Sequence, residues 1–455
     1  MPLFSKQFKI SKQLSTVQMI VLFYVTAVVF STVLLSMPFF KEAGASLSFL
    51  DTVFTAISAI SVTGLTVVST AEVFNSAGHI ALAFILQFGG IGIMTLGTFI
   101  YILFGKKIGL RGRQLIRIDQ NRTTLSGLVK LMLKILQIII IIELIGTIIL
   151  STYFLTYFDT WQEALIQGFF GAVSATTNAG FDITWNSLIP FANDYFVQFI
   201  NMVLLILGAI GFPVLIEIQE LLRGKHKDVH ERNTFSVFTK LTTITFFSLV
   251  VVGTILILLF EQNNFLADKV WHEKLFYSLF QSVTTRNGGL ATMDMNEFST
   301  PTLLMISGLM FIGASPSSVG GGIRTTTFAI MLLSIYNYAK GNQSIKVFGR
   351  QINQEDIVRS YIVITTASML CVASIIILTV TENFSTIAIM FEVFSAFGTT
   401  GLSLGITPEL SGFGKGVIMF LMFVGRIGIF SFLFIIRGKE KQDVFRYPSE
   451  KIIIG

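Results

Sequence analysis

The chain of 455 residues is 53% hydrophobic and 13% charged, with a mean hydropathy of +0.75 and a net charge of +6. Soluble domains carry about 25% charged residues, so this composition excludes an ordinary soluble protein and indicates an integral membrane protein. The single cysteine, Cys371, excludes a disulfide framework and a cysteine-rich metal site, and we expect it to be a small buried side chain.

The first apolar run extends from Val17 to Met37 and follows a basic segment, as it would in a signal peptide. About 20 apolar residues are enough to cross a bilayer. A small-residue cleavage site is missing, so we expect a retained first helix.

Basic stretches alternate along the chain with acidic connections such as FDTWQEA and ATMDMNEF. The basic stretches are 1–13, 105–134, 223–240, 339–359 and 437–451. The positive-inside rule places them in the cytoplasm. This predicts a multi-pass protein of the plasma membrane, in contact with lipid, with both termini cytoplasmic. Because the charge is not concentrated on one face or loop, we do not expect nucleic-acid binding.

A short polar segment containing glycine occurs four times between apolar runs. The four segments are SVTGL (61–65), TNAGF (177–181), RNGGL (286–290) and TTGLS (399–403). Their shared glycines lie about 110 residues apart, which is the signature of an internal repeat. We expect each unit to contain a span, a short helix, the polar strand and a returning span.

The returning spans repeat in step with the strands. They carry FGGIGI (88–93), LGAIGF (207–212), FIGASPSS (311–318) and VGRIGI (424–429). Two spans per unit give all four units the same orientation, unlike the inverted repeats of many secondary transporters. We therefore predict an all-α integral membrane protein with four parallel helix–pore-helix–helix repeats, or eight spans, around one central pore. The predicted repeats are 1–110, 111–225, 226–345 with an interrupted second span, and 346–455 with the C-terminal tail.

Non-helical backbone at membrane depth is tolerated where protein buries it or where it lines a water-filled cavity. Four strands around one axis form rings of carbonyl oxygens that can replace the hydration shell of a cation, and glycine allows positive φ there. Thr177 offers a further hydroxyl, and the short helices direct negative C-terminal ends at the axis. The predicted filter consists of Val62, Thr63, Gly64, Asn178, Ala179, Gly180, Asn287, Gly288, Gly289, Thr399, Thr400 and Gly401. For Gly89, Gly90 and Gly92 we favour close helix packing instead.

These segments carry a family resemblance. SVTGLTVV, ATTNAGFD, FQSVTTRNGGL, FIGASPSSVGGGIRTTTF, FSAFGTTGLS and MFVGRIG resemble the Trk/Ktr/HKT superfamily of potassium transporters, in particular the bacterial Ktr membrane subunits of the KtrB/KtrD type. The resemblance covers nearly the whole chain and implies that the four strands form a selectivity filter for K⁺. Plant relatives with serine at the first filter glycine favour sodium, so Gly64 implies potassium. Each strand departs from the potassium-channel pattern TVGYG, so selectivity is expected to be looser, and a sodium-coupled or sodium-permeable transporter is the alternative.

The resemblance also implies partners. A separate cytoplasmic regulatory subunit, an RCK-type ring that binds ATP or ADP, is expected, because the longest cytoplasmic stretch of this chain is too short to bind a nucleotide itself. A homodimer is implied as well, and the sequence has a feature that fits it. Ile452, Ile453 and Ile454 follow a basic segment and would need a cover. A second copy or packing on their own chain would provide it.

In the third strand, TTRNGGL, Arg286 is unexpected, because a guanidinium on the axis would repel a cation. Charges inside membranes usually pair. We therefore expect Arg286 to support the filter by pairing with Glu392 on the short helix of the fourth unit. The alternative is an exposed arginine at the outer mouth.

The third returning span contains GASPSSVGGGIRTTT (313–327), and the other three read as continuous apolar helix. Proline and consecutive glycines disfavour helix. We expect a polar loop below the filter that obstructs the pore, held by hydrogen bonds from Arg426 in the fourth returning span, with a purely structural arginine as the alternative. The predicted gate consists of Gly313, Pro316, Gly320, Gly321, Gly322 and Arg426.

An enzyme is not expected. Of the four histidines, only His79 could enter a span, and HExxH is missing, so an intramembrane protease would lack its base or metal ligands. GGIGIM lies in a span without the βαβ context of a dinucleotide site. Glu143 and Glu392 are the candidate intramembrane carboxylates, and neither is duplicated as an inverted-repeat cotransporter would require. We expect no organic cofactor in this chain, with K⁺ as its transported ion and Na⁺ as the alternative.

Overall fold

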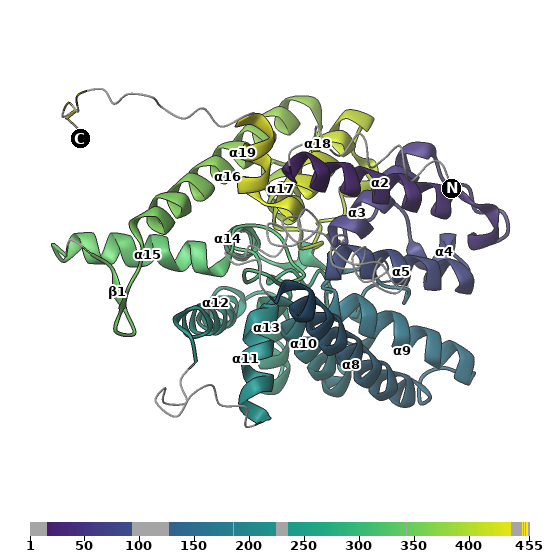
Figure 1. The fold of residues 1–455 in the computed structure, drawn as a ribbon. Coiled ribbons are helices and arrows are strands. Elements are labelled where there is room, and N and C mark those ends of the chain that lie inside the picture. Colours follow the sequence, from purple (N-terminus) through teal and green to yellow (C-terminus); the bar gives the residue numbers. More distant parts are fainter. Residues whose placement is uncertain are drawn as a thin grey trace.

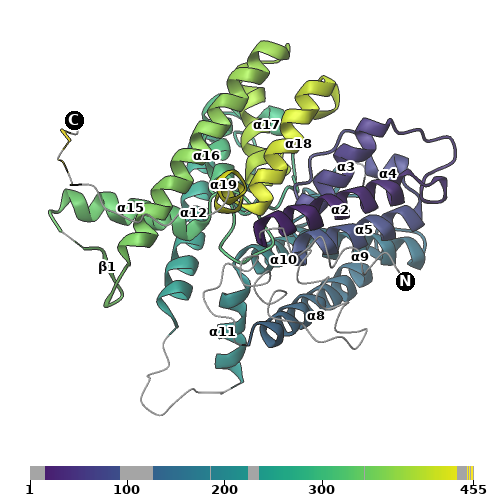
Figure 2. The same cartoon turned by 45° about the horizontal axis from the view of Figure 1, so that its top comes forward.

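The computed structural model describes residues 16–92, 127–184, 186–223, 235–342, 344–437, 448, 450, 452 and 453. These residues are almost entirely helical, apart from a hairpin of β1 (Lys346–Val347) and β2 (Arg350–Gln351). In Figure 1 the colours of the chain run round the molecule, and irregular segments gather at its centre. Figure 2 shows α15 (Thr325–Ala339) and the hairpin projecting to one side of the bundle.

Four long apolar helices recur at regular intervals along the chain. They are α2 (Thr16–Ser36), α8 (Leu128–Phe154), α12 (Val237–Glu261) and α16 (Gln354–Thr381). In α8, Gly146 and Leu150 are buried, whereas Leu144 and Ile148 are more than half exposed. A helix that is apolar on its exposed face as well as its buried face is typical of a membrane span.

Each long helix is followed by a shorter one. These are α3 (Phe49–Ser61), α9 (Trp161–Thr176), α13 (Trp271–Thr284) and α17 (Thr386–Gly398). Side chains fix where they begin: Ser48, Thr160 and Ser385 accept hydrogen bonds from backbone N–H groups of α3, α9 and α17. At α13 the Glu273 carboxylate accepts from the Val270 N–H instead, at 3.1 Å. Side-chain hydrogen bonds therefore stabilise the start of each of these four helices, and their C-terminal ends lead into the polar segments.

A second helix follows each polar segment. These helices are α5 (Ser76–Ile91), α10 (Tyr195–Ala209), α14 (Thr300–Phe311) and α18 (Gly412–Ile427). The remaining elements are short turns of helix in the connections, α4 (Thr70–Val73), η1 (Pro38–Phe40), η2 (Ile189–Phe191), η3 (Met295–Glu297) and η4 (Thr407–Glu409). In the described residues, four helices can cross a membrane by length and composition, or six if each bent pair counts as one span.

The expectation that only the third returning span is interrupted is wrong. Helix α10 bends by 103° into α11 (Phe212–Leu222), and α18 bends by 104° into α19 (Ile429–Arg437). Both breaks occur at a glycine with positive φ, Gly211 at 101° and Gly428 at 82°. Helix α5 also ends at such a residue, Gly92, and its continuation lies outside the described residues. The apolar composition of these spans concealed the breaks, because a single left-handed glycine is enough to end a helix.

The first and last parts of the chain pack together. Phe54 of α3, Phe397 of α17 and Ile418 of α18 belong to one buried apolar cluster. The Lys415 ammonium of α18 lies 2.9 Å from the Asp51 carboxylate of α3. The purple and yellow helices accordingly lie side by side in Figure 1. The helical units thus form a closed ring rather than an open row.

Close contact between α8 and α9 depends on Gly168. A Cβ added there would lie 2.6 Å from the Ser151 Cα and against the Ser151 amide nitrogen. We predict that Gly168→Ala lowers the free energy of unfolding by about 1–3 kcal/mol through overpacking, measured as a lower thermal unfolding temperature in detergent. Gly171→Ala on the same helix is the matched control, because the nearest neighbour of its added Cβ, Leu150 Cδ1, would be 3.9 Å away. Equal unfolding temperatures for the two variants would contradict this prediction.

Candidate functional site

The four polar segments share one backbone conformation. Each contains a glycine with positive φ: 86° at Gly64, 67° at Gly180, 70° at Gly289 and 96° at Gly401. The residue two positions before each glycine is also left-handed, at 57° in Val62, 53° in Asn178, 71° in Asn287 and 53° in Thr399. Positive φ is unfavourable for β-branched residues such as Val62 and Thr399. The surrounding structure must therefore enforce this conformation.

The segments meet in a closed ring. A Cβ added at Gly64 would lie 2.5 Å from the carbonyl oxygen of Ala179, and one at Gly180 would lie 3.4 Å from that of Gly288. Added Cβ atoms at Gly289 and Gly401 would meet the carbonyl oxygens of Thr400 and Thr63. In all four cases the neighbour is the residue before the glycine of the next segment. Four backbone carbonyls therefore converge at places that only glycine leaves open.

Hydrogen bonds to the preceding short helix hold each segment. The N–H of the residue before the glycine donates to a carbonyl in the last turn of the helix: Thr63 to Ser58 at 2.9 Å, Ala179 to Ser174 at 2.8 Å, Gly288 to Thr284 at 2.6 Å, and Thr400 to Ser395 at 2.9 Å. In three units a side-chain hydroxyl of the short helix makes a second hydrogen bond to the segment. Ser174 and Thr284 donate to the carbonyls of Phe181 and Leu290 at 2.5 and 2.6 Å, and Ser395 accepts from Gly401 N–H.

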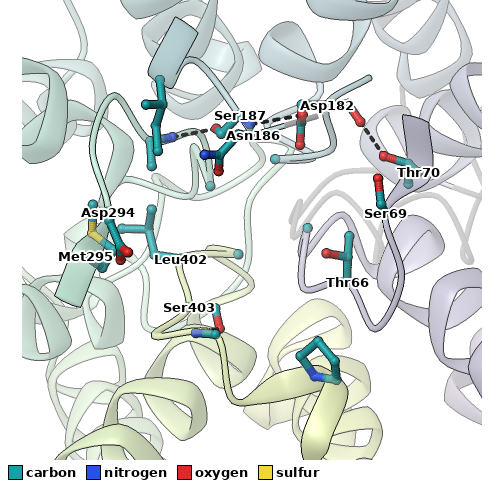
Figure 3. A pocket seen from close by; sticks show the side chains of 18 of the residues that line it. Thr66, Ser69, Thr70, Asp182, Asn186, Ser187, Asp294, Met295, Leu402 and Ser403 are labelled. Atoms are coloured by element: carbon teal, nitrogen blue, oxygen red, sulfur yellow. Dashed lines mark hydrogen bonds between the residues drawn. The ribbon is translucent and has the colours of Figure 1, made fainter. Parts of the chain in front are cut away.

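A cavity of about 540 Å³ opens onto the ring and is lined by all four glycines. Figure 3 shows that its other side chains come from all four parts of the chain. Asp182 and Asp294 are the charged residues among those that line it. The Asp182 carboxylate accepts hydrogen bonds from the Ser187 and Thr184 N–H groups, at 3.0 and 3.3 Å, which hold the loop in place. Carbonyl oxygens below two carboxylates form an arrangement that suits a cation and not an anion.

Most polar side chains of the predicted filter, and the nearby Thr177 hydroxyl, are directed at protein neighbours. The Thr63 hydroxyl lies 2.7 Å from that of Ser61, and the Thr177 hydroxyl donates to the Val173 carbonyl. The Asn178 amide donates to the Arg286 carbonyl at 3.3 Å. Backbone carbonyls, rather than these side chains, are therefore the groups that the ring gathers at its centre.

The predicted ion pair between Arg286 and Glu392 is wrong. Arg286 is 1% exposed, which also excludes an exposed arginine at the outer mouth. Its guanidinium donates to the Leu309 carbonyl in the last turn of α14, which has no partner within the helix. The Glu392 carboxylate instead accepts from the hydroxyls of Ser403 and Thr407, so the short helix α17 holds the segment after its own glycine.

The glycines of the returning helices pack against the short helices, which explains why they recur at a nearly constant distance after the glycines of the polar segments. Added Cβ atoms at Gly89, Gly208 and Gly425 would clash with carbonyls in the last turn of the adjacent short helix, those of Ile60, Thr176 and Phe397. Gly90 would clash with Thr177. Close packing is thus confirmed for Gly89 and Gly90. Gly92 differs, because its positive φ marks the end of α5.

In the third unit a loop replaces this helix contact. The chain leaves α14 at Ile312 and resumes helix at Thr325, and Pro316 and the three glycines 320–322 lie between. A Cβ at Gly313 would meet the Gly321 carbonyl, so the loop folds back on itself. As expected, Arg426 donates to a loop carbonyl, that of Val319, and it also donates to the carbonyls of Gly89 and Gly90 at the end of α5.

Arg324 is a further loop residue that the sequence reasoning missed. Its guanidinium donates to the Gly320 carbonyl and, at 3.4 Å, to that of Ser315. The available signal was a basic residue directly after three glycines and an isoleucine. Two arginines, Arg324 at the N-cap of α15 and Arg426 in α18, therefore hold the same loop.

The comparisons with known proteins agree with this geometry. Residues 2–446 match the TrkH family, described as cation transport protein. The chain belongs to the TrkH family. Its relatives include the Ktr system potassium uptake protein D of Bacillus subtilis, which is 55% identical over 98% of this chain and 99% of the relative. The potassium/sodium uptake protein NtpJ of Enterococcus hirae is 36% identical over 98% and 99%.

A solved TrkH-family structure has the same fold. The potassium transporter TrkH from Vibrio parahaemolyticus superposes with a TM-score of 0.68 over 91% of this chain and 84% of the other, at 20% sequence identity. The all-helical arrangement of this chain is therefore a TrkH-type fold.

The geometry at Gly64 predicts a selectivity effect in this TrkH-family protein. In Gly64→Ser the new Cβ would meet the Ala179 carbonyl and the Gly180 Cα, at 2.5 and 2.9 Å, and displace one side of the ring. We expect the ratio of potassium to sodium uptake to fall several-fold in reconstituted liposomes. Gly44→Ser is the control, because Gly44 has a similar φ of 88° but open space around it. An unchanged uptake ratio in a well-expressed Gly64→Ser protein would refute the prediction.

Proposed function

We propose that this protein takes up potassium ions through the ring of four glycine segments, which acts as a selectivity filter. The observation that carries the proposal is the convergence of four carbonyls, from Thr63, Ala179, Gly288 and Thr400, against the four glycines. Carbonyl oxygens can replace the hydration shell of a potassium ion. The four short helices end at the ring, so their negative C-terminal ends favour a cation there.

The proposed topology has eight spans in four parallel repeats. The repeats are 1–110, 111–225, 226–345 and 346–455, each with a long span, a short pore helix, a filter strand and a broken returning span. Both termini would lie in the cytoplasm of a plasma-membrane protein, since the basic stretches then face inward. The exposed apolar faces of α8, α12 and α16 support lipid contact.

Sodium is the second candidate ion. The relative NtpJ is named a potassium/sodium uptake protein, whereas the Bacillus relative is named for potassium alone. Each segment has few oxygen ligands beyond its carbonyls, because most side-chain hydroxyls and amides are directed at protein neighbours. Uptake by purified protein in liposomes, driven by a potassium or a sodium gradient, tests both candidates. Uptake of neither ion would refute the proposed function.

We further propose that the loop between α14 and α15 is the gate. Gly313, Pro316, Gly320, Gly321 and Gly322 keep this segment out of a helix, and its glycines allow more than one backbone conformation. Arg426 holds it through the Val319 carbonyl and adds a positive charge that disfavours cations below the filter. The alternative, a structural arginine, has its own support, because Arg426 also donates to the carbonyls of Gly89 and Gly90.

The gate predicts a gain of flux. Deleting residues 320–322, or replacing Arg426→Ala, should raise potassium uptake without any regulator by about tenfold, since hydrogen bonds from a charged group contribute about 1.5–3 kcal/mol. Arg359→Ala is the control, because that arginine is exposed and pairs with Glu355 on the same helix. Wild-type uptake in both gate variants would place the gate elsewhere.

A separate cytoplasmic subunit is proposed to move this loop. The relatives in Bacillus subtilis are named as proteins of a Ktr system, which implies more than one component. We propose an RCK-type ring that binds ATP or ADP and acts on the cytoplasmic ends of the broken helices. Flux through liposomes with and without the added ring protein, in each nucleotide, would test this.

We also propose a homodimer. Ile452 and Ile453 are 84% and 99% exposed, so in a single chain they do not pack on the described residues, and Ile454 lies outside them. A second copy would cover these side chains. Truncation after Lys451 should lower the dimer fraction in detergent, measured as mass by light scattering. A truncated protein with the full dimer mass would remove the argument.

A further inference from the structure

Asn287 joins two filter strands. Its side-chain amide nitrogen donates to the Gly398 carbonyl, to the Thr399 carbonyl at 3.1 Å and to the Thr399 hydroxyl at 2.9 Å. These acceptors belong to the last residue of α17 and the first residue of the fourth strand, whereas Asn287 belongs to the third strand. Because the amide is fully buried, losing it would leave buried carbonyls without a donor. The orientation of the carbonyls just below the ring therefore depends on where this amide lies.

The gate loop packs directly on the same group. A Cβ at Gly320 would lie 2.5 Å from Cγ of Asn287, and one at Gly313 would lie 3.2 Å from its Oδ1. A Cβ at Gly321 would lie 2.5 Å from the Thr399 hydroxyl, the partner of that amide. The loop glycines thus enclose the Asn287–Thr399 pair, and the loop lies against the underside of the filter.

Asn178 provides an internal comparison. It occupies the same position in the second strand, with a similar positive φ, and donates to the Arg286 carbonyl of the third strand. Its Oδ1 faces Gly208, which is in the regular helix α10 and not in the loop. The two asparagines hold strands in the same way, but only Asn287 of the two rests on a segment that we propose to move.

We infer that Asn287 is a positioning residue through which the gate loop sets the ion preference of the filter. The inference rests on the proposed function of the ring as a filter and of the loop as a gate. With the loop in place, its glycines confine the Asn287 amide against Gly398 and Thr399. Withdrawal of the loop removes this confinement, so the fourth-strand carbonyls gain freedom and distinguish potassium from sodium less well.

The test measures the ratio of potassium to sodium uptake in liposomes for four proteins. They are the wild type, Asn287→Gly, the deletion of 320–322, and the two changes combined. Glycine accepts the positive φ at 287, so the substitution removes the amide without backbone strain. We expect each single change to lower the ratio about fivefold, equivalent to roughly 1 kcal/mol or one hydrogen bond. The combination should lower it no further than either change alone.

Asn178→Gly is the matched control. With the same deletion, its effect on the ratio should multiply with that of the loop, because the Asn178 Oδ1 faces Gly208 of α10, whereas the Asn287 side chain faces Gly313 and Gly320 of the loop. If the Asn287→Gly and deletion effects also multiply, or if the deletion raises flux at an unchanged ratio, the inference is overturned and the gate proposal stands. If the wild type takes up neither ion, the proposed function fails instead.

A second perturbation guards against misfolding of the deletion. Gly320→Ala keeps the loop length and places a methyl group against the Asn287 amide, so we expect it to lower the ratio as the deletion does. Gly308→Ala in α14 is its control, because an added Cβ there meets nothing within 4 Å and should leave the ratio unchanged. A Gly320→Ala protein with the wild-type ratio would count against the inference.

Discussion

Each of the four glycine segments in this protein packs against the backbone of the next. The glycine of one strand leaves just enough room for the carbonyl that precedes the glycine of its neighbour, and this contact passes round all four units until the fourth strand meets the first. A ring of this kind can close only if the helices behind it also close. The apolar cluster shared by α3, α17 and α18, together with the contact between Lys415 and Asp51, completes that closure on the outside. Close backbone packing in the ring and buried apolar side chains between the outer helices therefore stabilise the same closed arrangement of four units.

The returning helices extend this dependence by one layer. In three units a glycine of the returning helix leaves room for a carbonyl at the end of the short helix. The returning helix therefore packs directly against that end. The third unit departs from this plan. There Arg286 is directed at the end of α14, and the loop carbonyl of Gly321 occupies the space beside Gly313 that a short-helix carbonyl takes elsewhere. The asymmetry of the molecule is thus concentrated in the third unit, where the loop between α14 and α15 replaces the helix contact.

The sequence predicted the parts of this architecture that repeat. The similar spacing of Gly64, Gly180, Gly289 and Gly401 was sufficient to expect four segments, and the structure brings these glycines together in one ring. The partner of Arg286 could not be foreseen, because it depends on the residue at which α14 ends, and a backbone carbonyl leaves no trace in composition. The breaks at Gly211 and Gly428 were missed for a similar reason. Hydropathy shows that a segment is apolar, but it does not show where the helix bends, because a positive φ at a single glycine is enough to change the direction of the helix axis.

The ring is built from one chain, and this has a consequence for how it can vary. In a channel assembled from four identical subunits, every substitution enters the ring four times and any gain at one strand is imposed on the others. Here the residue two positions before the glycine is valine, asparagine, asparagine and threonine in turn, all with nearly the same backbone. Because one chain contains all four strands at separate positions, a substitution can change one strand while the other three keep the ring closed. A single strand, such as the third with Asn287, can therefore acquire a contact to the loop between α14 and α15 without that contact being repeated at the other three strands.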